Sequence, residues 1–225
     1  MTALSLLAED LALAAVNPET GRHALGLRSH LNACLAGLLV AELVLEGAAA
    51  AGDRTGHVVR TGARTPESTT LAAAAQVVAE KAPKLKAILQ HMSRGLEGRL
   101  GLGTWDVVVA GLVADGALAP TEGAIRPKND IVDTGRRDAV IARLQAAAVD
   151  DGPIDPRTAL LLNMTGPANL LEVVAPERQG RRHARRRIDH GLDGSGLEIY
   201  GKMVRKVIAE AEAAGAGGAV AASSG

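Results

Sequence analysis

The hydrophobic pattern is strongest between residues 33 and 47, where apolar side chains occupy almost every position. A helix that is apolar on all sides is typical of the centre of a helical domain rather than of its surface. A run of about 15 residues is shorter than the roughly 20 that cross a bilayer. One carboxylate, Glu42, interrupts the run, and Gly47 follows it as a stop signal. The pattern therefore predicts a central buried helix over residues 31–46.

Apolar positions at helical spacing predict further helices around this one. The three consecutive valines after Trp105 favour a strand by propensity. Because Gly116 lies where a C-cap glycine would, we nevertheless predict a helix there. Other boundaries are set by proline or by capping residues, as at Asp155-Pro156. The predicted helices cover residues 4–16, 71–82, 84–94, 105–114, 136–148, 157–165, 168–174 and 196–214.

Little β-structure is expected. Residues 57–60 predict a short strand, and residues 117–119 and 124–126 flank a Pro-Thr-Glu-Gly turn and predict a small hairpin. The chain is therefore predicted to be mainly α, a helical bundle around a central apolar helix, with a small β-hairpin. We expect one domain over residues 1–214 and a disordered tail over residues 215–225, which are of low complexity.

Composition narrows the class of the protein. The 225 residues include no Phe, one Trp and one Tyr, so the core is built from Leu, Val, Ile and Ala. Such side chains suit close helix packing. Lys plus Arg and Asp plus Glu number 25 each, which excludes an overall basic field that would attract nucleic acid or anionic lipid. Few aromatics with abundant Ala, Gly and Arg are typical of a GC-rich genome and indicate a bacterial protein of actinobacterial type.

The sequence predicts no targeting or transmembrane segment. Glu9 and Asp10 interrupt the apolar N-terminal stretch, and no basic region precedes it, so it does not read as a signal peptide. Cys34, the one cysteine, lies in the central helix and is predicted to be a buried apolar residue. A single cysteine cannot form an internal disulfide, which fits a reducing compartment. We expect a cytoplasmic protein that meets membranes peripherally, at the inner face.

Candidate catalytic and metal-binding patterns are weak. The six histidines are scattered, and only His183 and His190 can share a helix face, without a third ligand. There is no Gly-x-Ser-x-Gly, no P-loop and no dinucleotide-binding glycine motif. If Glu42 is buried it needs a partner, and pairing with an arginine or with backbone amides is favoured over a role as catalytic acid. We predict no catalytic residues, no metal, no cofactor and no enzyme activity.

Arginines concentrate in a ten-residue stretch that also contains His183. A basic patch of this kind fits three interpretations: a solvated helix or loop whose arginines pair with acids elsewhere, contact with an anionic membrane surface, or contact with nucleic-acid phosphates. No aromatic residue is interleaved, which weakens single-strand nucleic-acid binding. The arginines are Arg178, Arg181, Arg182, Arg185, Arg186 and Arg187.

Three segments, in order and at fitting spacings, carry a family pattern. The first combines Leu-x-Ala-Glu-Asp near residue 6, Glu19-Thr20-Gly21, and the stretch from Glu42 to Gly47. The second is residues 112–118, and the third pairs residues 155–162 with 170–174. Together they resemble the Golgi phosphoprotein 3 family over residues 4–174, and more loosely to about residue 212. The resemblance implies a mainly helical fold around one apolar helix, phosphatidylinositol 4-phosphate binding at membranes, and a non-enzymatic adaptor role for Golgi glycosyltransferases.

The resemblance also shows where this chain departs from the family's lipid-binding pattern. The positions that the family uses for a Trp, an Arg and later basic residues fall on Leu27, Ala36, Leu102 and Trp105. Nearby arginines are candidates to rebuild a looser site, because arginine forms bidentate contacts with phosphate. These candidate lipid-binding residues are Arg28, Arg94 and Arg99.

We therefore expect a non-enzymatic peripheral membrane or adaptor domain that recognises an anionic phospholipid headgroup in a weakened or altered way. One alternative is a soluble protein–protein scaffold without lipid binding. The other is a nucleic-acid-binding module that uses the 178–187 arginine run, which the neutral net charge disfavours. The sequence identifies no protein partner.

Overall fold

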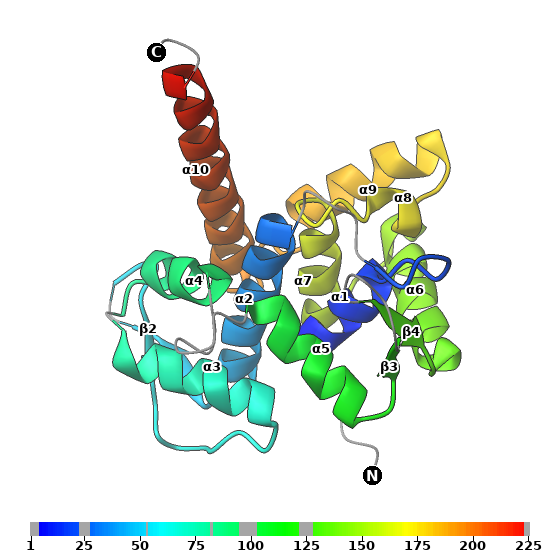
Figure 1. Cartoon of the computed structure of the whole chain (residues 1–225). Helices are drawn as coiled ribbons and strands as arrows, with labels where there is room; N and C mark the ends of the chain where they lie inside the picture. The colour runs from blue at the N-terminus through cyan, green and yellow to red at the C-terminus, as the bar shows by residue number, and fades with distance from the viewer. Residues whose placement is uncertain are drawn as a thin grey trace.

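A computed structural model gives the fold (Figure 1) and describes residues 5–22, 28–52, 54–81, 83–94, 103–121 and 128–222. The described residues are mainly helical, with two small antiparallel hairpins, which confirms the predicted fold class. The helices are α1 (Leu7–Ala15), α2 (Arg28–Leu45), α3 (Thr69–Glu80), α4 (Leu85–Arg94), α5 (Thr104–Ala114), α6 (Thr134–Val149), α7 (Pro156–Thr165), α8 (Leu171–Val174), α9 (Arg178–His190) and α10 (Glu198–Ala222).

Helix α2 lies at the centre of the fold, as predicted. It contacts α1, α3, α4, α5, α7 and α10. All residues from Leu31 to Leu43 are buried, Cys34 and Glu42 among them. Burying each leucine side chain there contributes about 1.5–3 kcal/mol relative to leaving it in water. The core therefore forms around α2, because the buried faces of six other helices meet there.

Helix α10 crosses α2 and α7 at close range. A Cβ atom at Gly37 of α2 would lie 2.4 Å from Cγ2 of Val204, and one at Gly201 of α10 would lie 2.2 Å from Oδ1 of Asn163. Only glycine permits such approaches, because any side chain at these positions would overlap the neighbouring helix. The C-terminal part of α10 extends away from the rest of the molecule (Figure 1).

The first hairpin joins β1 (Ala49–Ala51) to β2 (Val58–Arg60), with Ala50 opposite Val59. The strand predicted over residues 57–60 is therefore present. Its partner β1 was not predicted, because alanine has low strand propensity and its pairing here depends on the neighbouring strand.

The second hairpin is formed by β3 (Leu118–Pro120) and β4 (Asn129–Ile131). The predicted second strand, at residues 124–126, lies outside the described residues, and the residues that pair with β3 are 129–131. This register places Ile131 opposite Leu118. The backbone carbonyl of Gly21 accepts the Asn129 N–H at 2.8 Å, so a segment that precedes α2 helps to hold β4 in place.

The late helices form where they were predicted, with shifted ends. Asp155 caps α7 by accepting the Thr158 N–H at 3.0 Å, and Pro156 is the first helical residue. Helix α8 is shorter than the predicted 168–174, because Asn169 has a positive φ of 57° that an α-helix cannot contain. Helix α10 continues to Ala222, and the division of the chain at residue 214 stays a prediction.

Candidate functional site

The carboxylate of Glu42 is satisfied by structural partners. Its Oε1 lies 2.5 Å from Nη1 of Arg157 in α7, and its Oε2 accepts the Leu7 N–H at 3.3 Å. Burial raises the pKa of Glu42, and the Arg157 guanidinium acts in the opposite direction. The predicted pairing with an arginine and a backbone amide is confirmed. Glu42 joins α2 to α7 and to the first turn of α1.

Helix α1 carries two more buried carboxylates, each paired with an arginine of α6. Glu9 lies 2.7 Å from Arg136, and Asp10 lies 2.6 Å from Arg143. Ser5 connects the two pairs, since its hydroxyl donates to Asp10 at 2.6 Å and accepts from Arg136 at 2.7 Å. Burial raises the pKa of Glu9, and Arg136 acts against this shift. Sequence reasoning missed these pairs, although two acids inside an apolar stretch were a usable signal.

The arginine run forms helix α9. Its buried stripe consists of Ala184 and Ile188, four residues apart, which pack on the core. Four arginines point to solvent on the other faces: Arg178, Arg182, Arg185 and Arg186.

The other two arginines of α9 bind backbone carbonyls. Arg181 donates to the carbonyl of Pro176. Arg187 donates from Nη2 to the Gly152 carbonyl at 2.7 Å and from Nε to the Ala147 carbonyl at 3.3 Å. Within the described part of the chain, no α9 arginine forms an ion pair with a carboxylate. In the described ranges, the run is thus a solvated helix, as one interpretation had it, but its arginines are not paired with acids.

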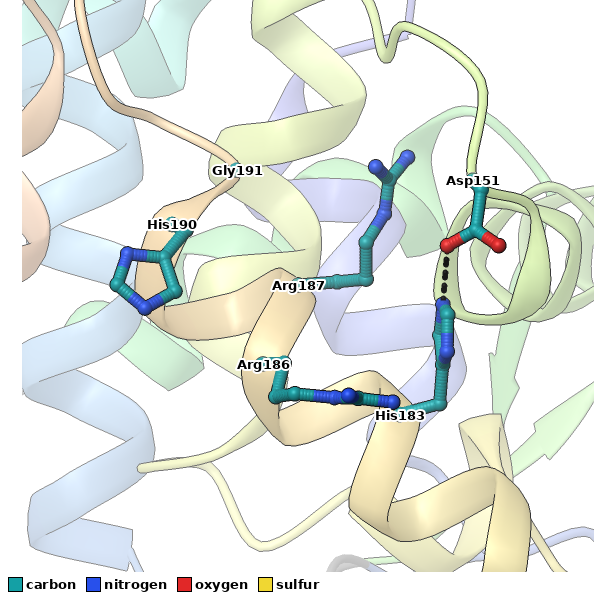
Figure 2. Close-up of a pocket in the computed structure, with 6 residues that line it drawn as sticks. All are labelled: Asp151, His183, Arg186, Arg187, His190 and Gly191. Carbon is teal, nitrogen blue, oxygen red and sulfur yellow. Dashed lines mark ion pairs between the residues drawn. The ribbon is translucent and has the colours of Figure 1, made fainter.

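A hollow of about 450 Å³ lies where α9 faces the loop between α6 and α7. In Figure 2, His183 of α9 faces Asp151 of this loop, and the His183 Nε2 to Asp151 Oδ1 distance is 3.4 Å. The ring of His190 points away from the Asp151 side (Figure 2), and its Nδ1 lies 3.2 Å from Asp193. The residues lining the hollow are Asp151, His183, Arg186, Arg187, His190 and Gly191.

A second hollow of about 400 Å³ lies nearer the start of α9. It is lined by Arg178, Gln179 and Arg182. The basic patch thus has two cationic recesses along one helix. Both are suited to anions, and neither contains the combination of nucleophile and base that an enzyme site requires.

The candidate lipid-binding arginines do not belong to α9. Arg28 is the first residue of α2, Arg94 is the exposed last residue of α4, and Arg99 lies outside the described residues. Of the positions aligned with the family's lipid-binding residues, Ala36 and Trp105 are buried, at 0% and 7% exposure. The other two, Leu27 and Leu102, also lie outside the described residues.

Two hydrogen bonds bring the ends of these helices together. The Thr104 hydroxyl, at the start of α5, donates to the Met92 carbonyl in the last turn of α4 at 2.7 Å. The Trp105 N–H donates to Oδ1 of Asn32, in the first turns of α2, at 2.8 Å. The starts of α2 and α5 and the end of α4 therefore meet at one place, and the positive ends of two helix dipoles lie there.

The ranges that the structure describes offer neither a metal site nor a membrane span. There, no three or more His, Cys, Asp or Glu side chains are placed to hold a metal ion. None of the helices in those ranges has the length and apolar character needed to cross a membrane. Burial also raises the pKa of the Cys34 thiol, which makes it a poor nucleophile.

Comparison with known proteins identifies a family. The profile of the Golgi phosphoprotein 3 (GPP34) family matches residues 7–211, from the start of α1 into α10. No curated protein matches the chain at a significant level. The matched range includes both the α9 arginines and the end of the fold where α2, α4 and α5 meet.

Proposed function

Because the chain belongs to the Golgi phosphoprotein 3 family, we propose that it is a peripheral membrane adaptor that recognises the headgroup of an anionic phospholipid. The family consists of non-enzymatic adaptors that bind phosphatidylinositol 4-phosphate at Golgi membranes. A bacterial origin and a cytoplasmic location at the inner face of a membrane are parts of this proposal.

The observation that carries the proposal is the meeting of helix ends described above. Arg28 begins α2 and Arg94 ends α4, and the contacts of Thr104 and Trp105 join these ends to the start of α5. Backbone N–H groups at helix N-termini and guanidinium groups both favour a phosphate. Arg99, in the connection between α4 and α5, is the third candidate.

We infer that recognition is altered relative to the family pattern. Ala36 replaces the family's central arginine and is fully buried, so it offers no headgroup contact. Trp105 is also buried, at 7% exposure, and its backbone N–H donates to Asn32. A site made of arginines without an aromatic anchor binds mainly by charge, and such binding weakens as salt increases.

Vesicle co-sedimentation tests the proposal. The full chain is mixed at low and at physiological salt with vesicles of neutral lipid, of phosphatidylglycerol in neutral lipid, or of phosphatidylinositol 4-phosphate in neutral lipid. The test variant carries Arg28→Ala, Arg94→Ala and Arg99→Ala. A matched control removes three exposed arginines elsewhere, Arg54→Ala, Arg60→Ala and Arg64→Ala.

We expect selective pelleting with phosphatidylinositol 4-phosphate that the test variant loses and the control retains. Equal losses in both variants would contradict a defined site and indicate surface charge alone. No pelleting at low salt by a folded protein would contradict lipid recognition and would favour the protein–protein scaffold.

A further inference from the structure

We propose that the hollow on α9 is a second anion site, which binds a phosphate monoester through Arg186, Arg187 and His183. It is built from α9 and the α6–α7 loop, whereas the proposed headgroup site lies where α2, α4 and α5 meet. The inference goes beyond the proposed function, because it requires neither a membrane nor Arg28, Arg94 and Arg99.

The two arginines of this site differ, since Arg186 is exposed and Arg187 is held in place by hydrogen bonds. Arg186 is exposed and has no carboxylate partner among the described residues. Arg187 is fixed by its hydrogen bonds to the carbonyls of Gly152 and Ala147, which leave guanidinium N–H groups unused and its charge unneutralised. His183 lies one helical turn before them and supplies an imidazole on the same side. Two guanidinium groups and an imidazole provide more donors than a carboxylate can accept, but they match a tetrahedral phosphate.

Asp151 occupies the place of an incoming anion. It is the only carboxylate among the residues that line the hollow, and its Oδ1 lies 3.4 Å from the buried Nε2 of His183. That nitrogen has no well-aligned hydrogen bond within the described structure. The Asp151 side chain is 92% exposed, so it can turn to water at little cost. We infer that a bound phosphate displaces Asp151 from His183.

The volume of the hollow indicates the size of the ligand. Sites for small molecules typically enclose about 300–1,000 Å³, and this one measures about 450 Å³. That is enough for a phosphate group with a sugar-sized or glycerol-sized substituent. A phosphorylated small molecule and the exposed monoester of a lipid headgroup share this chemistry, and the experiment below separates them.

The first experiment is a titration of the full chain with inorganic phosphate, followed by amide NMR shifts. Three variants are compared with the unmodified chain: Arg186→Ala, the control Arg185→Ala, and Asp151→Asn. Arg185 is the adjacent exposed arginine of α9 and does not line the hollow. The two arginine variants lose the same charge from the same helix.

We expect shifts confined to α9 and the α6–α7 loop. Arg186→Ala should weaken phosphate binding about tenfold, the effect of losing a charge-assisted contact. Arg185→Ala should change it by less than about twofold, as expected for a surface charge outside the site. Asp151→Asn should tighten binding, because the competing carboxylate is removed. Absence of phosphate shifts, or equal weakening by both arginine variants, would overturn the proposal.

A second experiment identifies the source of the phosphate. Vesicles containing phosphatidic acid, a monoester, are compared with phosphatidylglycerol, a diester, in the Arg28→Ala, Arg94→Ala, Arg99→Ala background. If the chain pellets with phosphatidic acid but not with phosphatidylglycerol, and Arg186→Ala abolishes this pelleting, the site is supported and its ligand is a lipid headgroup. Phosphate binding without pelleting supports the site and assigns it to a soluble phosphorylated molecule. If the chain is retained on DNA, and Arg185→Ala and Arg186→Ala reduce that retention equally, the proposal is overturned. The whole basic face of α9 would then bind polyanions without a defined site.

Discussion

Helices α1 and α9 are opposites in their use of charge. Every residue of α1 is buried, and its two carboxylates each contact an arginine of α6. Helix α9 carries six arginines, four of them exposed, and none is paired with a carboxylate in the described ranges. The zero net charge of the chain therefore does not arise from uniform pairing. Charge inside the molecule holds helices together, whereas the charge on α9 is exposed and, in the described ranges, not paired with carboxylates.

The largest expected effect comes from removing the counter-ion of Glu42, which is less exposed than Glu9 and Asp10. Arg157→Met leaves the Glu42 carboxylate, at 2% exposure, without its counter-ion. We expect the free energy of unfolding to fall by about 3–5 kcal/mol, as for other broken buried pairs. Urea unfolding followed by circular dichroism measures the change. Adding Glu42→Gln to the same chain should recover much of the loss, because no buried charge then remains.

The stability of the Arg157→Met variant should also depend on pH in a defined direction. Burial already raises the pKa of Glu42 above 4.5, and loss of Arg157 raises it further. A carboxyl group whose pKa is raised by folding binds more protons in the folded chain than in the unfolded chain. The variant is therefore expected to lose stability as pH rises from about 4.5 through the raised pKa of Glu42. An equal loss of unfolding free energy at pH 5 and at pH 8 would contradict this account. The control is Lys86→Met, which removes a half-exposed ion pair with Glu210.

Removing the arginine of either α1 ion pair should lower the free energy of unfolding by an intermediate amount, which differs between the two pairs. The side chain of Arg136 is 23% exposed and that of Arg143 is 44% exposed. Arg136→Met should cost about 2–3 kcal/mol, because Glu9 is left in a dry environment. Arg143→Met should cost about 1–2 kcal/mol, because water can replace the more exposed guanidinium and the Ser5 hydroxyl still contacts Asp10. Thermal unfolding of the two variants gives the order, and a larger loss for Arg143→Met would refute this reasoning.

The smallest effect on stability is expected on α9. Arg182→Ala together with Arg185→Ala should change the free energy of unfolding by less than about 0.5 kcal/mol, because both side chains are exposed and unpaired. The same denaturant titration checks it. A loss of several times that size would mean that these arginines support the fold, and the contrast with α1 would disappear.

The sequence alone could predict the elements that depend on local pattern. The apolar run identified α2, and the cost of burying a carboxylate predicted that Glu42 would have a partner. It could not select Arg157 from 25 basic residues, because α7 reaches Glu42 only through the packing of the whole bundle. The same limit applies to β4, since Gly21, far away in the chain, helps to set its position.

The candidate site was predictable only in part. Composition identified the α9 arginines, but the sequence left open whether they lie on a helix or in a loop. The hollow also needs Asp151 and Gly152 from another loop, and nothing local connects these residues to α9. The assignment of Arg28, Arg94 and Arg99 to lipid stays a prediction.

The close crossing of α2 and α10 has a consequence for synthesis on the ribosome. Gly37 emerges early, and Val204, which packs against it, emerges only after most of the chain has been made. At about 5–20 residues per second, this interval lasts roughly 10–30 s. During that time one side of the central helix α2 lacks its cover, so a nascent chain stalled before α10 would expose apolar surface to chaperones and to neighbouring nascent chains.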